Sequence, residues 1–96
     1  MLDEDRIRKI AREVASANLA TANVTSVSSS PIIDSEGHDA LRIIIVIKSG
    51  SEFKIGGDAA LDTLVGIKSR LRREGEERSA IVEYATKEEL DAGGDP

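Results

Sequence analysis

The sequence predicts a small α+β domain, a two-layer α/β sandwich with the element order α-β-β-α-β. Three observations lead to this class: two amphipathic segments with helical spacing of their apolar residues, one strand-length run of isoleucine and valine, and short connections rich in glycine and serine. At 96 residues the chain has room for one hydrophobic core. We therefore expect a three-stranded mixed sheet with two helices on one face.

Residues 3–19 are predicted to form the first helix. Ile7, Ile10 and Val14 recur at spacings of three and four residues, which places them on one face. Acidic residues come first, where the helix dipole favours negative charge, and basic residues follow them. The segment is close to neutral, unlike a basic helix that lies on a membrane surface.

A first strand is predicted over residues 21–31, which are rich in serine and β-branched residues. Its exposed face is largely serine. Pro31 lacks the N–H that a central strand donates to its neighbour. The strand should therefore end near Pro31 or run along an edge of the sheet.

Residues 40–49, with the sequence ALRIIIVIKS, give the clearest strand. A strand with one face in water alternates apolar and polar residues, but here Ile44 and Val46 make the second face apolar as well. These two residues need cover from a helix, a partner chain or a ligand. We interpret them, together with Tyr84 or Ile81 depending on strand register, as an interaction surface.

A short extended piece is predicted at residues 52–55, and the second helix follows with Asp58 as its N-cap. This helix should end before Gly75, which stands at the expected C-cap region. Gly66 inside the helix costs roughly 1 kcal/mol relative to alanine. It indicates either close packing at that point or simple tolerance.

The last strand is predicted over residues 77–86. The first two strands should form an antiparallel hairpin, and the second helix should be a right-handed crossover that leaves the last strand parallel to the second. Residues 1–88 then form a single domain. Residues 89–96 are acidic and end in Gly-Gly-Asp-Pro, so we expect a disordered tail.

Composition disfavours several classes of function. A net charge of −5, a pI near 4.8 and a single Phe and Tyr make nucleic acid an unlikely partner. The chain has no cysteine, and its N-terminus is charged from the third residue, so we expect a cytoplasmic protein without a secretory leader. No apolar run approaches the ~20 residues that span a bilayer. Neither a cofactor nor a membrane partner is expected.

The stretch DSEGHD contains Asp34, Glu36, His38 and Asp39 around one glycine. These residues suit turn chemistry between two strands. They are also weak candidates for a metal or ligand site, although the twelve-residue spacing of a calcium loop and a second nitrogen ligand are both missing. The turn is the first interpretation, and a metal or substrate role is the alternative.

Two further motifs attract attention. The glycine pair in KIGGDAAL precedes a helix, but its spacing matches neither common phosphate-binding loop, so a helix start is the simpler interpretation. A basic cluster surrounds the end of the second helix and consists of Lys68, Arg70, Arg72, Arg73 and Arg78. It suits solvation and the helix dipole, or else electrostatic docking of an acidic tail from a neighbouring subunit.

Catalysis finds little support, because no serine lies in a G-x-S-x-G turn and a chain of this size rarely encloses two rigid acids. We expect no enzyme. The sequence favours a small cytosolic protein-interaction or regulatory module that self-associates, as a homodimer, through an apolar sheet face with Ile44, Val46 and Tyr84. The alternative is a ligand- or metal-binding domain that uses residues 34–39, and a weaker one is a nucleic-acid-binding domain.

Overall fold

A computed structural model of the protein describes residues 1–19, 24–50 and 55–93. The elements follow the predicted order, with one short helix added: α1 Glu4–Asn18, β1 Val24–Ile33, β2 Asp39–Ile47, α2 Gly57–Arg73, β3 Ser79–Thr86 and α3 Lys87–Gly93. The predicted small α+β domain is confirmed. The start of the predicted first strand, residues 21–23, and most of the predicted piece at 52–55 lie outside the described residues.

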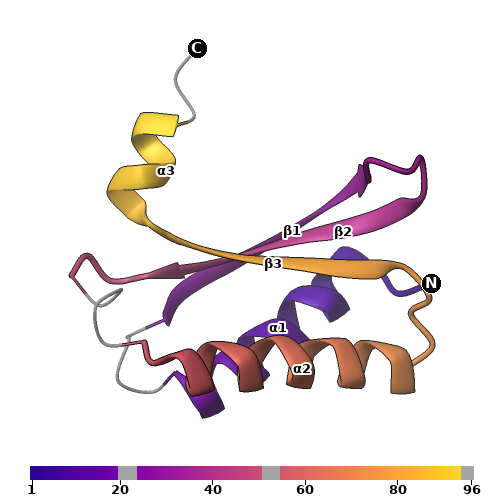
Figure 1. Ribbon diagram of the computed structural model, residues 1–96, viewed down its shortest axis with the longest axis horizontal. Helices are drawn as coiled ribbons and strands as arrows, with labels where there is room; N and C mark the ends of the chain where they lie inside the picture. The colour runs from indigo at the N-terminus through magenta and orange to yellow at the C-terminus, as the bar shows by residue number, and fades with distance from the viewer. Residues whose placement is uncertain (20–23, 51–54, 94–96) are drawn as a thin grey trace.

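The sheet has the strand order β1-β2-β3, with β1 antiparallel and β3 parallel to the central strand β2. Helices α1 and α2 lie together on one face, whereas α3 rises from the end of β3 on the other side (Figure 1). Pro31 lies on the edge strand β1, as predicted, and the strand continues past it to Ile33. The edge tolerates proline because its missing N–H takes nothing from a neighbouring strand.

The hydrophobic core lies between the helices and the sheet. Alternate residues of β2 point into it because successive side chains of a strand point to opposite faces. The large aliphatic side chains that are fully buried include Ile7, Ile10, Leu41, Ile43, Ile45, Ile47 and Ile67. Each comes from the isoleucine and leucine pattern that predicts the elements, so the pattern also predicts which face of each element is buried.

Gly66 lies where α2 packs against Val14 of α1. A Cβ atom built at this position would lie 2.8 Å from Val14 Cγ1, which is closer than side chains approach one another. Of the two explanations for this glycine, the structure supports close packing. The absence of a side chain at Gly66 allows the two helices to pack closely at Val14.

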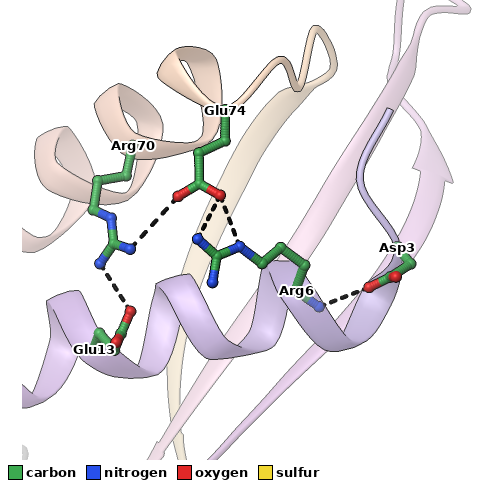
Figure 2. Close-up of polar contacts among 5 residues, drawn as sticks. All are labelled: Asp3, Arg6, Glu13, Arg70 and Glu74. Carbon is green, nitrogen blue, oxygen red and sulfur yellow. Dashed lines mark hydrogen bonds and ion pairs between the residues drawn. The ribbon is translucent and has the colours of Figure 1, made fainter.

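Ion pairs also join the two helices, beyond the Gly66 contact (Figure 2). Arg6 donates to Glu74 Oε1 from Nε at 2.7 Å, and Arg70 Nη1 lies 3.0 Å from Glu13 Oε1. Arg70 Nη2 also lies 3.6 Å from Glu74 Oε2, so Glu74 contacts both arginines. The hydrogen bond from Arg6 holds the pKa of Glu74 below its usual value. At the start of α1, the N–H of Arg6 donates to Asp3 Oδ1, which caps the helix.

The ends of α2 differ in part from the prediction. The N-cap is Gly56 rather than Asp58, because Gly56 has the extended backbone of a cap and Asp58 already lies in the first helical turn. An acidic residue there still interacts favourably with the dipole. Gly75 follows the helix with φ +95°, a conformation that favours glycine. The N–H of Glu76 then donates to the carbonyl of Leu71 and closes the turn.

Helix α3 is an element that the sequence analysis did not predict. Thr86 and Glu89 form a reciprocal pair: the N–H of Thr86 donates to Glu89 Oε1, and the N–H of Glu89 donates to Thr86 Oγ1. This is a capping box, which satisfies two free donors at the start of a helix. The helix through Gly93 differs from the disordered tail expected from residue 89, and residues 94–96 lie outside the described part.

Ser29 contributes a buried polar atom on the helix side of the sheet. It lies opposite Ile43, and its Oγ has no hydrogen-bond partner among the described residues. A buried hydroxyl without a partner costs about 1 kcal/mol or more. Ser29→Ala is therefore expected to raise the free energy of unfolding by about 1 kcal/mol in denaturant titration. The matched control is Ser28→Ala, on the exposed side of the same strand, which should change it little. Lower stability of Ser29→Ala would contradict this account.

Candidate functional site

The open sheet face is the side of the sheet that faces away from α1 and α2 (Figure 1). Strand register brings four rows of residues onto it, each with one residue from β1, β2 and β3. The rows are Ser26, Val46 and Ala85; Ser28, Ile44 and Glu83; Ser30, Arg42 and Ile81; and Ile32, Ala40 and Ser79. The face therefore has an apolar middle with serines along one edge.

The apolar residues of this face differ in exposure. Val46 is buried, with 5% of its surface exposed, whereas Ile44 is half-buried and Ile81 is 43% exposed. Ile44 and Val46 do lie on one face, as the alternation of the strand requires. A partner could contact Ile44 and Ile81 directly, whereas Val46 has almost no exposed surface to offer.

Tyr84 lies on the opposite side of the sheet from Ile44 and Val46. It is level with Ile45, packs against the core and donates its hydroxyl to the carbonyl of Ala60 at 3.4 Å. Burial raises the pKa of Tyr84. The inclusion of Tyr84 in the interaction surface was therefore wrong, because the parallel register leaves Ile81 on the open face instead.

The open sheet face carries one charge of each sign. Arg42 Nε donates to Glu83 Oε1 at 2.8 Å and to Oε2 at 3.2 Å, across the boundary between β2 and β3. The remaining described strand residues on this face are uncharged. The face is consequently neutral, although the whole chain carries a charge of −5.

DSEGHD forms the hairpin turn between β1 and β2. Asp34 Oδ1 accepts from the N–H groups of Glu36 and His38, and these bonds, chiefly the one from His38, lower the pKa of Asp34. Gly37 adopts φ +83°, which the turn requires. These contacts account for the turn. His38 Nδ1 lies 3.8 Å from Asp34 and 4.0 Å from Glu36, and Asp39 begins β2.

No group of three or more acidic or histidine side chains in the described part of the chain is arranged to hold a metal ion. Asp34, the least exposed carboxylate of the turn, already accepts two backbone hydrogen bonds. The use of residues 34–39 as a ligand site remains a prediction from sequence. Of the helices that the structure describes, none is long and apolar enough to cross a membrane.

The basic cluster at the end of α2 separates into paired and unpaired residues. Arg70 contacts Glu13 and Glu74, and Arg78 contacts Glu76. Lys68, Arg72 and Arg73 form no ion pair with any residue in the described ranges. Only these three remain available to a partner, and all three lie on the outer side of α2.

Glu76 and Arg78 form a buried pair that sequence reasoning missed. The Glu76 carboxylate accepts from the N–H of Leu2 at 2.9 Å and from the backbone and guanidinium of Arg78. These hydrogen bonds, chiefly those from the Arg78 side chain, lower the pKa of Glu76 to about 2. The pair joins the N-terminus to the loop before β3. The only signal in the sequence was the short spacing of the two charges after Gly75.

Comparison with known proteins adds little to this picture. No protein-family model and no curated protein matches the chain. Among solved structures, the chain is similar to one described as "Crystal structure of Brucella canis Acyl-CoA Synthetase", at 16% sequence identity and a TM-score of 0.42. The match covers 77% of this chain and 13% of that one, so the chain spans a small part of its length.

Proposed function

We propose that the protein is a self-associating interaction module that pairs through its open sheet face. The observation that carries this proposal is the diagonal position of Ile44 and Ile81 on neighbouring strands of a face that neither α1 nor α2 covers. Transferring such side chains from water is favourable by about 25 cal/mol per Å² of apolar area. A domain of this size buries a modest share of its surface alone and gains from an added interface.

A second copy of the chain is the partner that the charges of this face suit best. Arg42 and Glu83 give it one cation and one anion, so two copies related by a two-fold axis can place Arg42 of each near Glu83 of the other. Such solvent-exposed pairs contribute orientation more than affinity. This neutral face offers no net charge of the opposite sign to a strongly charged partner.

Replacing Ile81 with lysine tests this function. Ile81→Lys is expected to weaken self-association about tenfold or more, measured by sedimentation velocity over a range of concentrations, because it places a charge inside the contact. The free energy of unfolding of the monomer should change little, since the side chain is already 43% exposed.

The matched control is Ile33→Lys. Ile33 is an isoleucine of an edge strand that is 64% exposed, but it pairs with Asp39 at the hairpin end and lies off the open sheet face. Its substitution should leave self-association unchanged. Equal effects of the two variants, or a wild-type protein that stays monomeric at millimolar concentration, would overturn the proposal.

A further inference from the structure

The outer stripe of α2 is a second surface without a partner in the described chain. It consists of Asp58, Leu61, Val65, Lys68 and Arg72, which follow one another at three- and four-residue spacings and so share one side of the helix. Leu61 is 58% exposed and Val65 is 55% exposed. Two aliphatic side chains in adjacent turns of α2 are therefore exposed on this side.

The charges of this stripe are free, in contrast to those on the side of α2 that faces α1. Arg70 there contacts Glu13 and Glu74 (Figure 2). Asp58 and Arg72 form no ion pair with any residue that the structure describes. They are also too far apart to meet within one helix, because fourteen residues rise about 21 Å.

The order of residues along the stripe is acidic, apolar and then basic. Asp58 lies near the start of α2, Leu61 and Val65 follow, and Lys68 and Arg72 lie near the end. Val65 is the midpoint between Asp58 and Arg72, seven residues from each. An antiparallel copy of the same helix therefore matches acid to base at both ends and Val65 to Val65 in the middle.

We infer that α2 packs antiparallel against α2 of a second copy, around a two-fold axis at Val65. Asp58 of each chain then faces Arg72 of the other, and the two Val65 side chains meet at the axis. Leu61 packs beside the aliphatic stem of Lys68 from the other chain. A shallow groove of about 380 Å³, lined by residues that include Val65, Ser69 and Arg72, receives the opposing side chains.

This contact is distinct from pairing through the open sheet face. The outer stripe of α2 belongs to the helix layer, and the open sheet face lies on the other side of the sheet (Figure 1). One chain can therefore make both contacts at once, and two different two-fold contacts on one chain lead to assemblies larger than a dimer. The α2 contact does not depend on the sheet contact, so each can fail alone.

Charge reversal tests the α2 contact in the Ile81→Lys background, where the sheet contact is removed. Asp58→Arg and Arg72→Asp are each expected to weaken the remaining dimer about tenfold in sedimentation velocity. The double variant Asp58→Arg/Arg72→Asp should restore the dissociation constant to within about threefold. Restoration requires contact between chains, because the two residues cannot meet within one helix. Two single variants without effect, or a double variant that is not restored, would overturn the inference.

A cysteine at the axis gives a second measurement that does not depend on charge. The chain has no cysteine, so Val65→Cys introduces a single thiol. Under mild oxidation it is expected to form a disulfide-linked dimer rapidly, since residues on a two-fold axis lie within disulfide distance. Ile33→Cys, at a somewhat more exposed position elsewhere, is the control. Crosslinking of Val65→Cys no faster than the control would contradict an axis at this residue.

Discussion

Glu76→Ala is expected to lower the free energy of unfolding by about 3 to 4 kcal/mol and the melting temperature by roughly 15 °C. The Glu76 side chain is buried and accepts four hydrogen bonds, one from Leu2 and three from Arg78. Its loss leaves Arg78, with 14% of its side chain exposed, without a counterion. It also detaches the N-terminus from the loop before β3. Thermal and chemical denaturation measure both quantities.

Two further variants give this prediction its controls. Glu77→Ala removes an exposed carboxylate from the next position and should have little effect on stability. Glu76→Gln keeps the size and one acceptor but removes the charge, so its stability should fall between wild type and Glu76→Ala. A loss of stability in Glu76→Ala no greater than in Glu77→Ala would show that the buried pair has no structural role.

The same carboxylate gives a pH dependence. The pKa of Glu76 is lowered from 4.5 to about 2 by its hydrogen bonds with Arg78. A group with a lowered folded-state pKa contributes stability above its unfolded pKa and loses it as the pH falls through the folded value. The stability that Glu76 contributes should thus decline as the pH falls from about 5 to about 2. Glu76→Gln lacks this contribution, so the difference between the two proteins should shrink over the same range. A difference in stability between wild type and Glu76→Gln that does not change with pH would contradict this prediction.

Gly66→Ala is expected to destabilise the protein by about 1 kcal/mol, even though alanine is the better helix former by about the same amount. The added methyl group meets Val14 Cγ1 at 2.8 Å, so α1 and α2 must separate or Val14 must move. The larger Gly66→Val should cost about 3 kcal/mol. Denaturant titration measures these differences directly.

A double-mutant cycle identifies the cause. In a Val14→Ala background the close methyl group is absent, and Gly66→Ala should then stabilise the protein by up to about 1 kcal/mol. The effect of Gly66→Ala on the free energy of unfolding thus changes sign with the residue at position 14. Gly57→Ala, at the exposed start of the same helix with no atom near the added Cβ, is the control and should be neutral or stabilising. The same destabilisation in both backgrounds would show that Val14 is not the obstacle.

The sequence predicts the fold well because its strongest patterns are aliphatic and periodic. The spacing of Ile7, Ile10 and Val14 defines the buried face of α1, and the alternation in β2 defines both faces of the central strand. Crossover handedness and hairpin length then leave few alternatives for the sheet. These features depend on local spacing, which a sequence displays directly.

Features that depend on register or on distant contacts were harder to predict. The sequence analysis assigned Tyr84 to the wrong face because nothing in the sequence sets the parallel alignment of β3 with β2. Glu76 contacts Leu2, 74 residues away, so its burial has no local signal. Helix α3 did have one, since Thr86 and Glu89 have the spacing of a capping box, but the acidic composition of the tail obscured it.

The most direct test of self-association through the open sheet face is an isotope-filtered NMR experiment on a mixture of labelled and unlabelled protein. Contacts between chains are expected at the methyl groups of Ile44 and Ile81, and these contacts should disappear in Ile81→Lys. Contacts between chains that never involve these two residues, or none at all at concentrations where the protein associates, would contradict it.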